Sequence, residues 1–191
     1  MLITKTNPEG IDWYIQQLQT KLHTRLIAAD ELNLADPNKY KCYGRCYRNK
    51  KDNGYIAENY EGNAEYSEVY WDDTLTAISF FGLTNSVKAG INHEADIHLV
   101  FFVDLNKLAL KDKSGTIITH RADEEVRNSV QQIIGNSSYG FKYVSTELWL
   151  ENVLREYPGT RRDERLKHVD MHPVHCFRIN LKLIYNPNKN C

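Results

Sequence analysis

The residues of this chain that could carry chemistry gather near its C-terminus. His168, Asp170, His172 and His175 fall within eight residues, and imidazole and carboxylate groups are both metal ligands. Pro173 interrupts the segment and no Glu follows the first His, so the spacing does not match the helical zincin motif. These four residues support one alternative hypothesis, a small metal-dependent enzyme.

Two other groups of residues also invite a chemical interpretation. Asp96, His98 and Asp104 fall on one face of an expected strand, where Asp–His pairs can do acid–base work. No nucleophile elbow, phosphate loop or dinucleotide glycine pattern accompanies them. Cys42 and Cys46, four residues apart on a strand, would lie about 13 Å from each other, too far to share one metal. We therefore predict a protein that is not an enzyme and holds no metal or cofactor.

Composition and charge narrow the class of protein. The chain has 191 residues, with 24 basic and 25 acidic side chains and a net charge of −1. This balance argues against sequence-specific nucleic-acid binding, which depends on clustered Lys and Arg. We expect no membrane span, because no run of about 18 apolar residues occurs. The polar N-terminus and four scattered cysteines predict a cytoplasmic protein with reduced thiols.

The elements that must position any site are indicated by apolar periodicity. Residues 175–185 alternate between apolar and polar, which predicts a strand of roughly 36 Å with one buried face. A strand that long can extend past its own sheet, and we expect its overhang to pair with another copy. The expected elements are helices over residues 9–29, 122–134 and 145–157, strands over 41–47, 54–60, 76–83, 95–105 and 175–185, and a linker over 85–92.

The order of these elements predicts an α+β fold. We expect a mainly antiparallel sheet, with the N-terminal helix and the two later helices packed on one face and a long C-terminal strand. We expect residues 1–191 to form a single domain. Residues 40–70 are rich in Tyr and contain turn signals such as Asn53-Gly54, so we expect a hairpin insertion there.

This arrangement resembles the tail-terminator and tail-completion (head–tail joining) proteins of long-tailed bacteriophages. The matching parts are the helical stripe over residues 11–26, the strand over 95–105, the helix over 122–134 and the closing strand over 177–185. The Tyr-rich region over 40–70 has no counterpart in that family. The resemblance implies a non-enzymatic ring in the virion, assembled in the bacterial cytoplasm at the head-proximal end of the tail. Its partners would be further copies of itself, tail-tube protein and head–tail connector proteins.

Aromatic residues and arginine are enriched at protein interfaces, which guides the choice of contact residues. The residues that we predict for an interface are Tyr43, Arg45, Tyr47, Arg48, Tyr55, Lys182 and Tyr185. Two hypotheses stay open beside the ring-forming protein: the metal-dependent enzyme and an intracellular ligand-binding module.

Overall fold

The computed structural model of the protein describes residues 1–28, 37–52, 54–111, 114, 116–120, 123–160 and 172–187. The helices are α1 (Ile11–Ala28), α2 (Asp123–Gly135) and α3 (Leu150–Val153), with short 3₁₀ helices at Pro37–Lys39 and Leu105–Lys107. The strands are β1 (Leu2–Ile3), β2 (Tyr40–Arg45), β3 (Tyr47–Lys51), β4 (Gly54–Gly62), β5 (Glu65–Glu68), β6 (Ala77–Ala89), β7 (Asn92–Asp104), β8 (Ala109–Lys111), β9 (Ile117–His120), β10 (Phe141–Glu147) and β11 (Val174–Tyr185). The predicted α+β class is confirmed.

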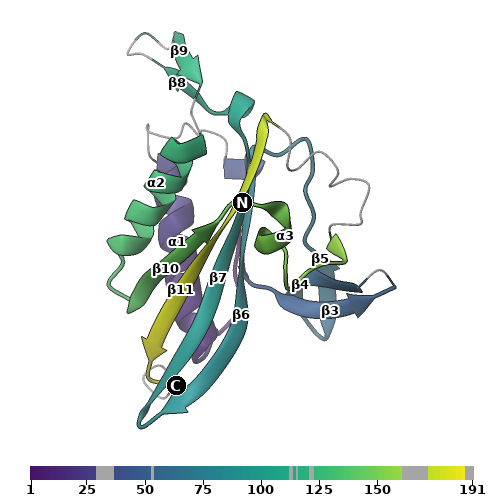
Figure 1. Ribbon diagram of the computed structural model, residues 1–191, viewed down its shortest axis with the longest axis vertical. Coiled ribbons are helices and arrows are strands. Elements are labelled where there is room, and N and C mark those ends of the chain that lie inside the picture. The colour runs from purple at the N-terminus through teal and green to yellow at the C-terminus, as the bar shows by residue number, and fades with distance from the viewer. Residues whose placement is uncertain are drawn as a thin grey trace.

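A six-stranded sheet with the order β1-β2-β6-β7-β11-β10 forms the centre of the molecule (Figure 1). β6, β7, β11 and β10 pair antiparallel, whereas β1 and β2 join at one side as parallel strands. β6 and β7 have 13 residues each and β11 has 12, against a usual strand length of about 5–6. These three long strands extend well past α3, toward the end of the molecule where β11 ends (Figure 1).

One face of this sheet is covered by α1 and α2. Both helices bury apolar residues at the three- and four-residue spacing of an amphipathic helix. The buried residues are Ile15, Leu18, Leu22, Leu26, Val126, Val130 and Ile134. β11 contributes alternate residues to the same core: Phe177, Ile179, Leu181, Leu183 and Tyr185. The predicted N-terminal helix and the buried face of the C-terminal strand are confirmed.

The opposite face of the sheet carries α3 and a smaller sheet with the order β3-β4-β5. Val153, Leu154 and Tyr157 belong to a second apolar core there, and the ring centroids of Tyr157 and Phe80 lie 5.4 Å apart. The prediction that both later helices share one face is therefore wrong for α3. Val153 of α3, and Leu154 and Tyr157 just after it, belong to the same core as Val100 and Phe102, two even-numbered residues at the centre of β7.

The third helix is also shorter than predicted. Residues 145–147 were expected to begin it, but they pair with residues 178–180 of β11 as part of β10. The β-branched residues Val144 and Thr146 favour a strand. α3 consequently begins only after Trp149, which takes the N-cap position.

Two predictions about the strands are wrong. Residues 85–92 are not a linker, because they continue β6 and begin β7, with Ala89 opposite Asn92 across a turn at Gly90. Residues 41–45 do not pair with β4; they form β2, beside β6 in the central sheet. The hairpin partner of β4 is β3, so the Tyr-rich insertion forms a separate sheet only from Tyr47 onward.

The predicted overhang of the C-terminal strand is also wrong. β11 pairs with β7 over its whole length, from Val174 opposite Asp104 to Tyr185 opposite His93. β10 covers its other side from residue 178 to residue 183. Because β7 is as long as β11, every residue of β11 has a partner on β7 within the same chain. In the described part of the chain, no helix combines the length and the apolar character that a membrane span requires.

Candidate functional site

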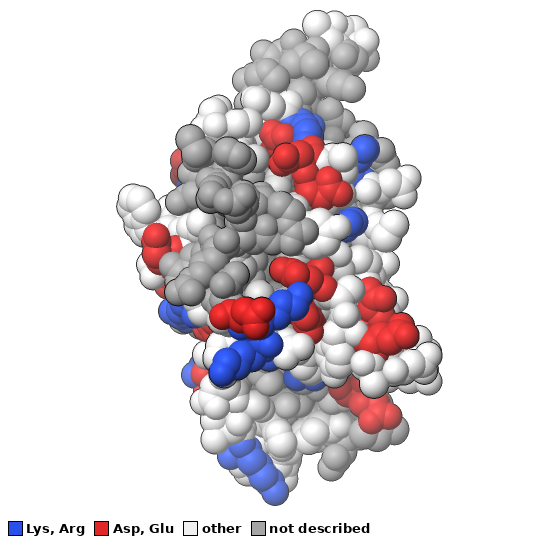
Figure 2. Space-filling view, turned by 90° about the vertical axis from the view of Figure 1, so that its right-hand side faces the viewer, with Lys and Arg blue, Asp and Glu red and all other residues white. Residues whose placement is uncertain are grey.

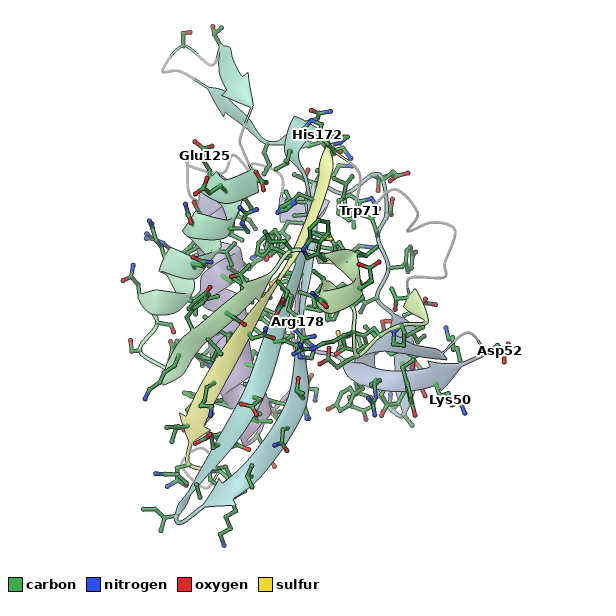
Figure 3. The ribbon with its side chains drawn as sticks, in the orientation of Figure 1. Lys50, Asp52, Trp71, Glu125, His172 and Arg178 are labelled. Atoms are coloured by element: carbon green, nitrogen blue, oxygen red, sulfur yellow. The ribbon has the colours of Figure 1, made fainter. Side chains whose placement is uncertain are left out.

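A buried polar cluster interrupts the core between the central sheet and α3. At its centre is Arg178 of β11, which is 0% exposed and lies in the middle of the molecule (Figure 3). Its Nη2 donates a hydrogen bond to Glu156 Oε1 at 2.9 Å, and its Nη1 donates to Oε2 of the same carboxylate. Its Nε donates to Asn180 Oδ1 at 2.7 Å. A bidentate ion pair therefore joins β11 to the turn that follows α3.

His98 and Tyr157 extend the cluster toward β6. His98 Nε2 is 3.2 Å from the Tyr157 hydroxyl, and His98 Nδ1 is 3.1 Å from Thr84 Oγ1. Gly82 lies opposite His98 in the register of β6 and β7. A Cβ atom at Gly82 would lie 2.1 Å from His98 Nε2 and 2.3 Å from the Tyr157 oxygen. Glycine is therefore required there for its small size.

The titratable groups of this cluster are held in forms that do not exchange protons near neutral pH. Burial lowers the pKa of His98 to about 3, and the charge of Arg178 acts in the same direction. Burial alone would raise the pKa of Glu156, but the hydrogen bonds from Arg178 and nearby positive charge lower it to about 2. Burial raises the pKa of Tyr157 well above its usual value. A general acid or base works best with a pKa near the operating pH, so the cluster is suited to holding structure rather than to moving protons.

A cleft of about 290 Å³ opens beside the cluster. Thr84, Glu156 and Tyr157 line one part of it, and the other part is lined by the end of β2 and the start of β3. Three of the residues predicted for an interface line this cleft: Arg45, Tyr47 and Arg48. The structure therefore brings this part of the predicted interface together with a polar cluster that the sequence did not reveal.

Arg45 and Tyr47 are fixed by a network of ion pairs and hydrogen bonds. Arg45 Nε is 2.6 Å from Asp12 Oδ1, and Lys5 Nζ is 2.5 Å from Asp12 Oδ2. The Tyr47 hydroxyl accepts hydrogen bonds from Lys5 Nζ at 2.6 Å and from Arg45 Nη2 at 2.9 Å. These contacts tie the start of α1 to β2 and β3, so the cleft has a rigid wall.

Arg48 and Tyr55 lie at the surface of the small sheet. The guanidinium carbon of Arg48 is 4.3 Å from the centre of the Tyr55 ring, a cation–π distance. Lys50 and Asp52 lie at the outer end of this sheet (Figure 3). Figure 2 faces this side of the molecule and shows basic and acidic side chains interspersed over the described surface. The surface therefore presents local pairs of opposite charge, as a solvated face or an interface rim does.

Backbone contacts hold the small sheet against the rest of the molecule. The amide of Gly159, in the turn after α3, donates to the carbonyl oxygen of Tyr55 at 2.8 Å. A Cβ atom at Gly159 would lie 2.9 Å from backbone atoms of Gly54 and Tyr55. The same turn carries Glu156 and Tyr157, so the position of the small sheet and the geometry of the polar cluster depend on each other.

The remaining predicted interface residues lie outside the cleft. Tyr43 and Tyr185 are 8% and 7% exposed, each within one of the two apolar cores, so they present little surface to a partner. Lys182 lies on the exposed part of β11, where its Nζ is 2.6 Å from Glu94 Oε1.

The residues of the metal hypothesis are not gathered by the described structure. His168 and Asp170 lie outside the described residues. His172 is exposed, and His175 Nε2 accepts a hydrogen bond of 2.9 Å from Arg127, which uses a lone pair that a metal would need. Within the described ranges, no group of three or more His, Cys, Asp or Glu residues is placed to hold a metal ion.

The sequence interpretation missed the partners in the cluster. It placed His98 with Asp96 and Asp104, whereas the ring of His98 bonds to Thr84 and Tyr157. Two signals were available: a glycine after Phe80-Phe81 in an apolar strand, and an arginine between Phe177 and Ile179. A glycine inside a strand marks a close approach of another group, and a buried arginine requires a carboxylate.

A second candidate surface lies along β10, the outermost strand of the central sheet within the described residues. Large apolar side chains are exposed on this strand and just after it: Tyr143, Val144, Leu148 and Trp149. Trp149 is 72% exposed. Exposed apolar groups that adjoin one another on a sheet edge are a mark of association with another protein.

Comparison of the chain with protein-family models and with curated proteins gives no match. The functional proposal therefore depends on the fold and on these two surfaces.

Proposed function

We propose that the protein is a non-enzymatic assembly protein of a bacteriophage or prophage virion, similar to a tail terminator. It would act in the bacterial host cytoplasm by forming a ring on the head-proximal end of the tail. Its partners would be further copies of itself, tail-tube protein and head–tail connector proteins. The observation that carries this proposal is the set of exposed apolar side chains at the β10 edge, with Tyr143 and Val144 on the strand and Leu148 and Trp149 just after it.

The chemistry of β10 suits contact through side chains. A bulge between Tyr143 and Ser145 shifts the register of β10 against β11. Bulges and a lysine such as Lys142 hinder the addition of another strand to a sheet edge. Trp149 stands just beyond this irregular edge, and tryptophan is among the residues that contribute most to binding energy in interfaces. We therefore expect a partner to pack on Trp149 and its apolar neighbours.

The outline of the molecule supports an assembly role. The β6–β7 and β8–β9 hairpins project from opposite ends of the body (Figure 1). Ile91 at the β6–β7 turn is 84% exposed, and Val87 of the same hairpin is also exposed. The apolar tip of the β6–β7 hairpin can reach a neighbouring subunit, and contacts between different surfaces of one chain generate rings.

Electron microscopy of the purified protein mixed with tail-tube protein tests the proposal. We expect ring-shaped density at one end of each tube. Trp149→Glu should abolish this density, while Thr24→Glu, which adds the same charge at an exposed position of α1, should leave it intact. A chain that stays monomeric at all concentrations and never binds tubes would contradict the proposal.

A further inference from the structure

An aromatic cavity lies between the start of α1, the residues before β10 and the end of β11. It belongs to neither of the surfaces described above. It has a volume of about 490 Å³, within the range of ~300–1,000 Å³ typical of small-molecule sites. Its aromatic lining comes from three separate segments: Trp13 and Tyr14 of α1, Tyr139 before β10, and Tyr185 at the end of β11.

The aromatic rings of the cavity support one another. Trp13 lies edge-on to Tyr14 and to Tyr139, with centroid separations of 5.0 Å and 6.2 Å. Tyr185 contacts Tyr14 at 5.6 Å and is backed by His93 at 5.5 Å. Edge-on and tilted contacts at these distances are favourable. The rings are therefore held in place before any ligand arrives, which lowers the entropy lost on binding.

A glycine brings Tyr139 to the cavity. Gly140 has a φ of +82°, a conformation that other residues rarely adopt. A Cβ atom at Gly140 would also lie 3.1 Å from the carbonyl oxygen of Ile184. Glycine thus lets the chain turn tightly against the end of β11, and Tyr139 joins the wall as a result.

The polar groups of the cavity are neutral and can both donate and accept hydrogen bonds. Asn92 and Ser138 line it together with the tyrosines, and none of the described residues that line it carries a formal charge. An amide and hydroxyl groups of this kind match a ligand whose own groups are hydroxyls. A charged ligand would lose its hydration here without gaining a counter-charge.

We propose that this cavity binds a neutral sugar ring, such as one pyranose unit of a glycan. A pyranose presents an apolar C–H face, which can lie on one of the two perpendicular rings of Trp13 and Tyr139 while the side of the sugar contacts the other. It also presents a rim of hydroxyls, which suits Asn92 and Ser138. This proposal stands apart from the assembly role and does not depend on it.

Nuclear magnetic resonance of the full chain tests this proposal. The protein has three tryptophans and therefore three indole N–H signals, of which the one lost in Trp13→Phe belongs to Trp13. Titration with neutral methyl pyranosides and N-acetylglucosamine should shift the Trp13 signal at millimolar concentrations. Tyr139→Ala, followed through the Trp13 signal, and Trp13→Ala, followed by isothermal titration calorimetry, should each weaken binding by about tenfold or more, because each removes an aromatic ring that contacts the ligand.

Control variants and ligands make the outcome decisive. Tyr66→Ala removes an exposed aromatic ring of β5 outside the cavity and should leave the affinity unchanged. Trp13→Phe keeps a ring in place and should retain most of the binding, and thermal unfolding of each variant reports whether it is folded. The proposal is overturned if no neutral sugar shifts the Trp13 signal, if only choline or glucuronate does, or if Tyr139→Ala binds as the unmodified chain does.

Discussion

The two faces of the central sheet are built from the same strands but are stabilised by different interactions. On β11, Phe177 faces α1 and α2, whereas the adjacent Arg178 faces α3, and both are 0% exposed. Phe177 is stabilised by the area it removes from water, which needs no particular partner. Arg178 is stabilised only while Glu156 balances its charge. Two residues that are equally buried can therefore differ in which substitutions they tolerate without loss of stability.

The largest loss of stability is expected from a substitution on the face of the central sheet that α1 and α2 cover. Phe177→Ala removes a fully buried ring that stacks on Phe101 at 5.2 Å. We expect a loss of about 4 kcal/mol in the free energy of unfolding, from lost burial and the cavity left behind. Urea denaturation measures this loss. Lys50→Ala, at an exposed position of β3, is the control and should change the same quantity by less than about 0.5 kcal/mol. A loss below about 1 kcal/mol for Phe177→Ala would show that this face is not closely packed.

The next largest loss of stability is expected on the opposite face of the sheet, where an ion pair takes the place of apolar packing. Arg178→Met should cost about 3 kcal/mol, because it leaves the largely buried Glu156 carboxylate with only the half-exposed Arg155 as a cation partner. The double variant Arg178→Met with Glu156→Leu should recover more than half of that loss in the same denaturation assay, since no unpaired charge remains. If the two losses simply add, the ion pair is not the unit that stabilises this face.

A smaller loss of stability is expected at Gly82, where β6 lies closest to the side chains of the polar face. Gly82→Ala places a methyl group against His98 and Tyr157 and should cost about 2 kcal/mol through overpacking and separation of that pair. Gly135→Ala at the end of α2 is a matched control, because nothing lies within 4 Å of its added Cβ atom. Equal melting temperatures for the two variants would contradict the close approach of β6 to His98.

The last effect is a dependence of stability on pH that belongs to the polar face. The pKa of His98 is lowered from 6.5 to about 3, so only the unfolded chain gains a proton there as the pH falls through this window. Its neutral form therefore contributes full stability above pH 6.5, and this contribution declines as the pH falls toward 3. The lowered pKa of Glu156, about 2 against 4.5, acts in the same direction at lower pH.

His98→Gln separates these two contributions. Between pH 6.5 and 4.5 its free energy of unfolding should fall less steeply than that of the unmodified chain. Thr24→Gln, at an exposed position of α1, should keep the original slope. Identical slopes for all three proteins would mean that His98 titrates normally in the folded chain.

The apolar face could be predicted from the sequence, but most of the polar face could not. The stripe of α1 and the alternation of β11 are local patterns, and each determines which side of its element is buried. The ion pair of Arg178 joins residues 22 positions apart in the chain, and no local pattern indicates which carboxylate an arginine will meet. Arg178 was accordingly assigned to a wet face although it is fully buried.

The interface residues show the same limit. Tyrosine suits both a half-buried strand and an exposed contact surface, so its type alone does not separate Tyr43 in a core from Tyr55 at the surface. Trp149 was missed as a surface residue because it was placed inside a helix over residues 145–157. Its exposure depends on β10 pairing with β11 up to Glu147, which is a long-range contact.

Sedimentation velocity over a wide concentration range tests the central claim, that this chain acts by associating through the exposed edge of β10. We predict that the unmodified chain and Thr24→Glu form the same oligomer, alone or with tail-tube protein, and that Trp149→Glu sediments as a monomer at every concentration. A Trp149→Glu variant that assembles as well as the unmodified chain would contradict the account.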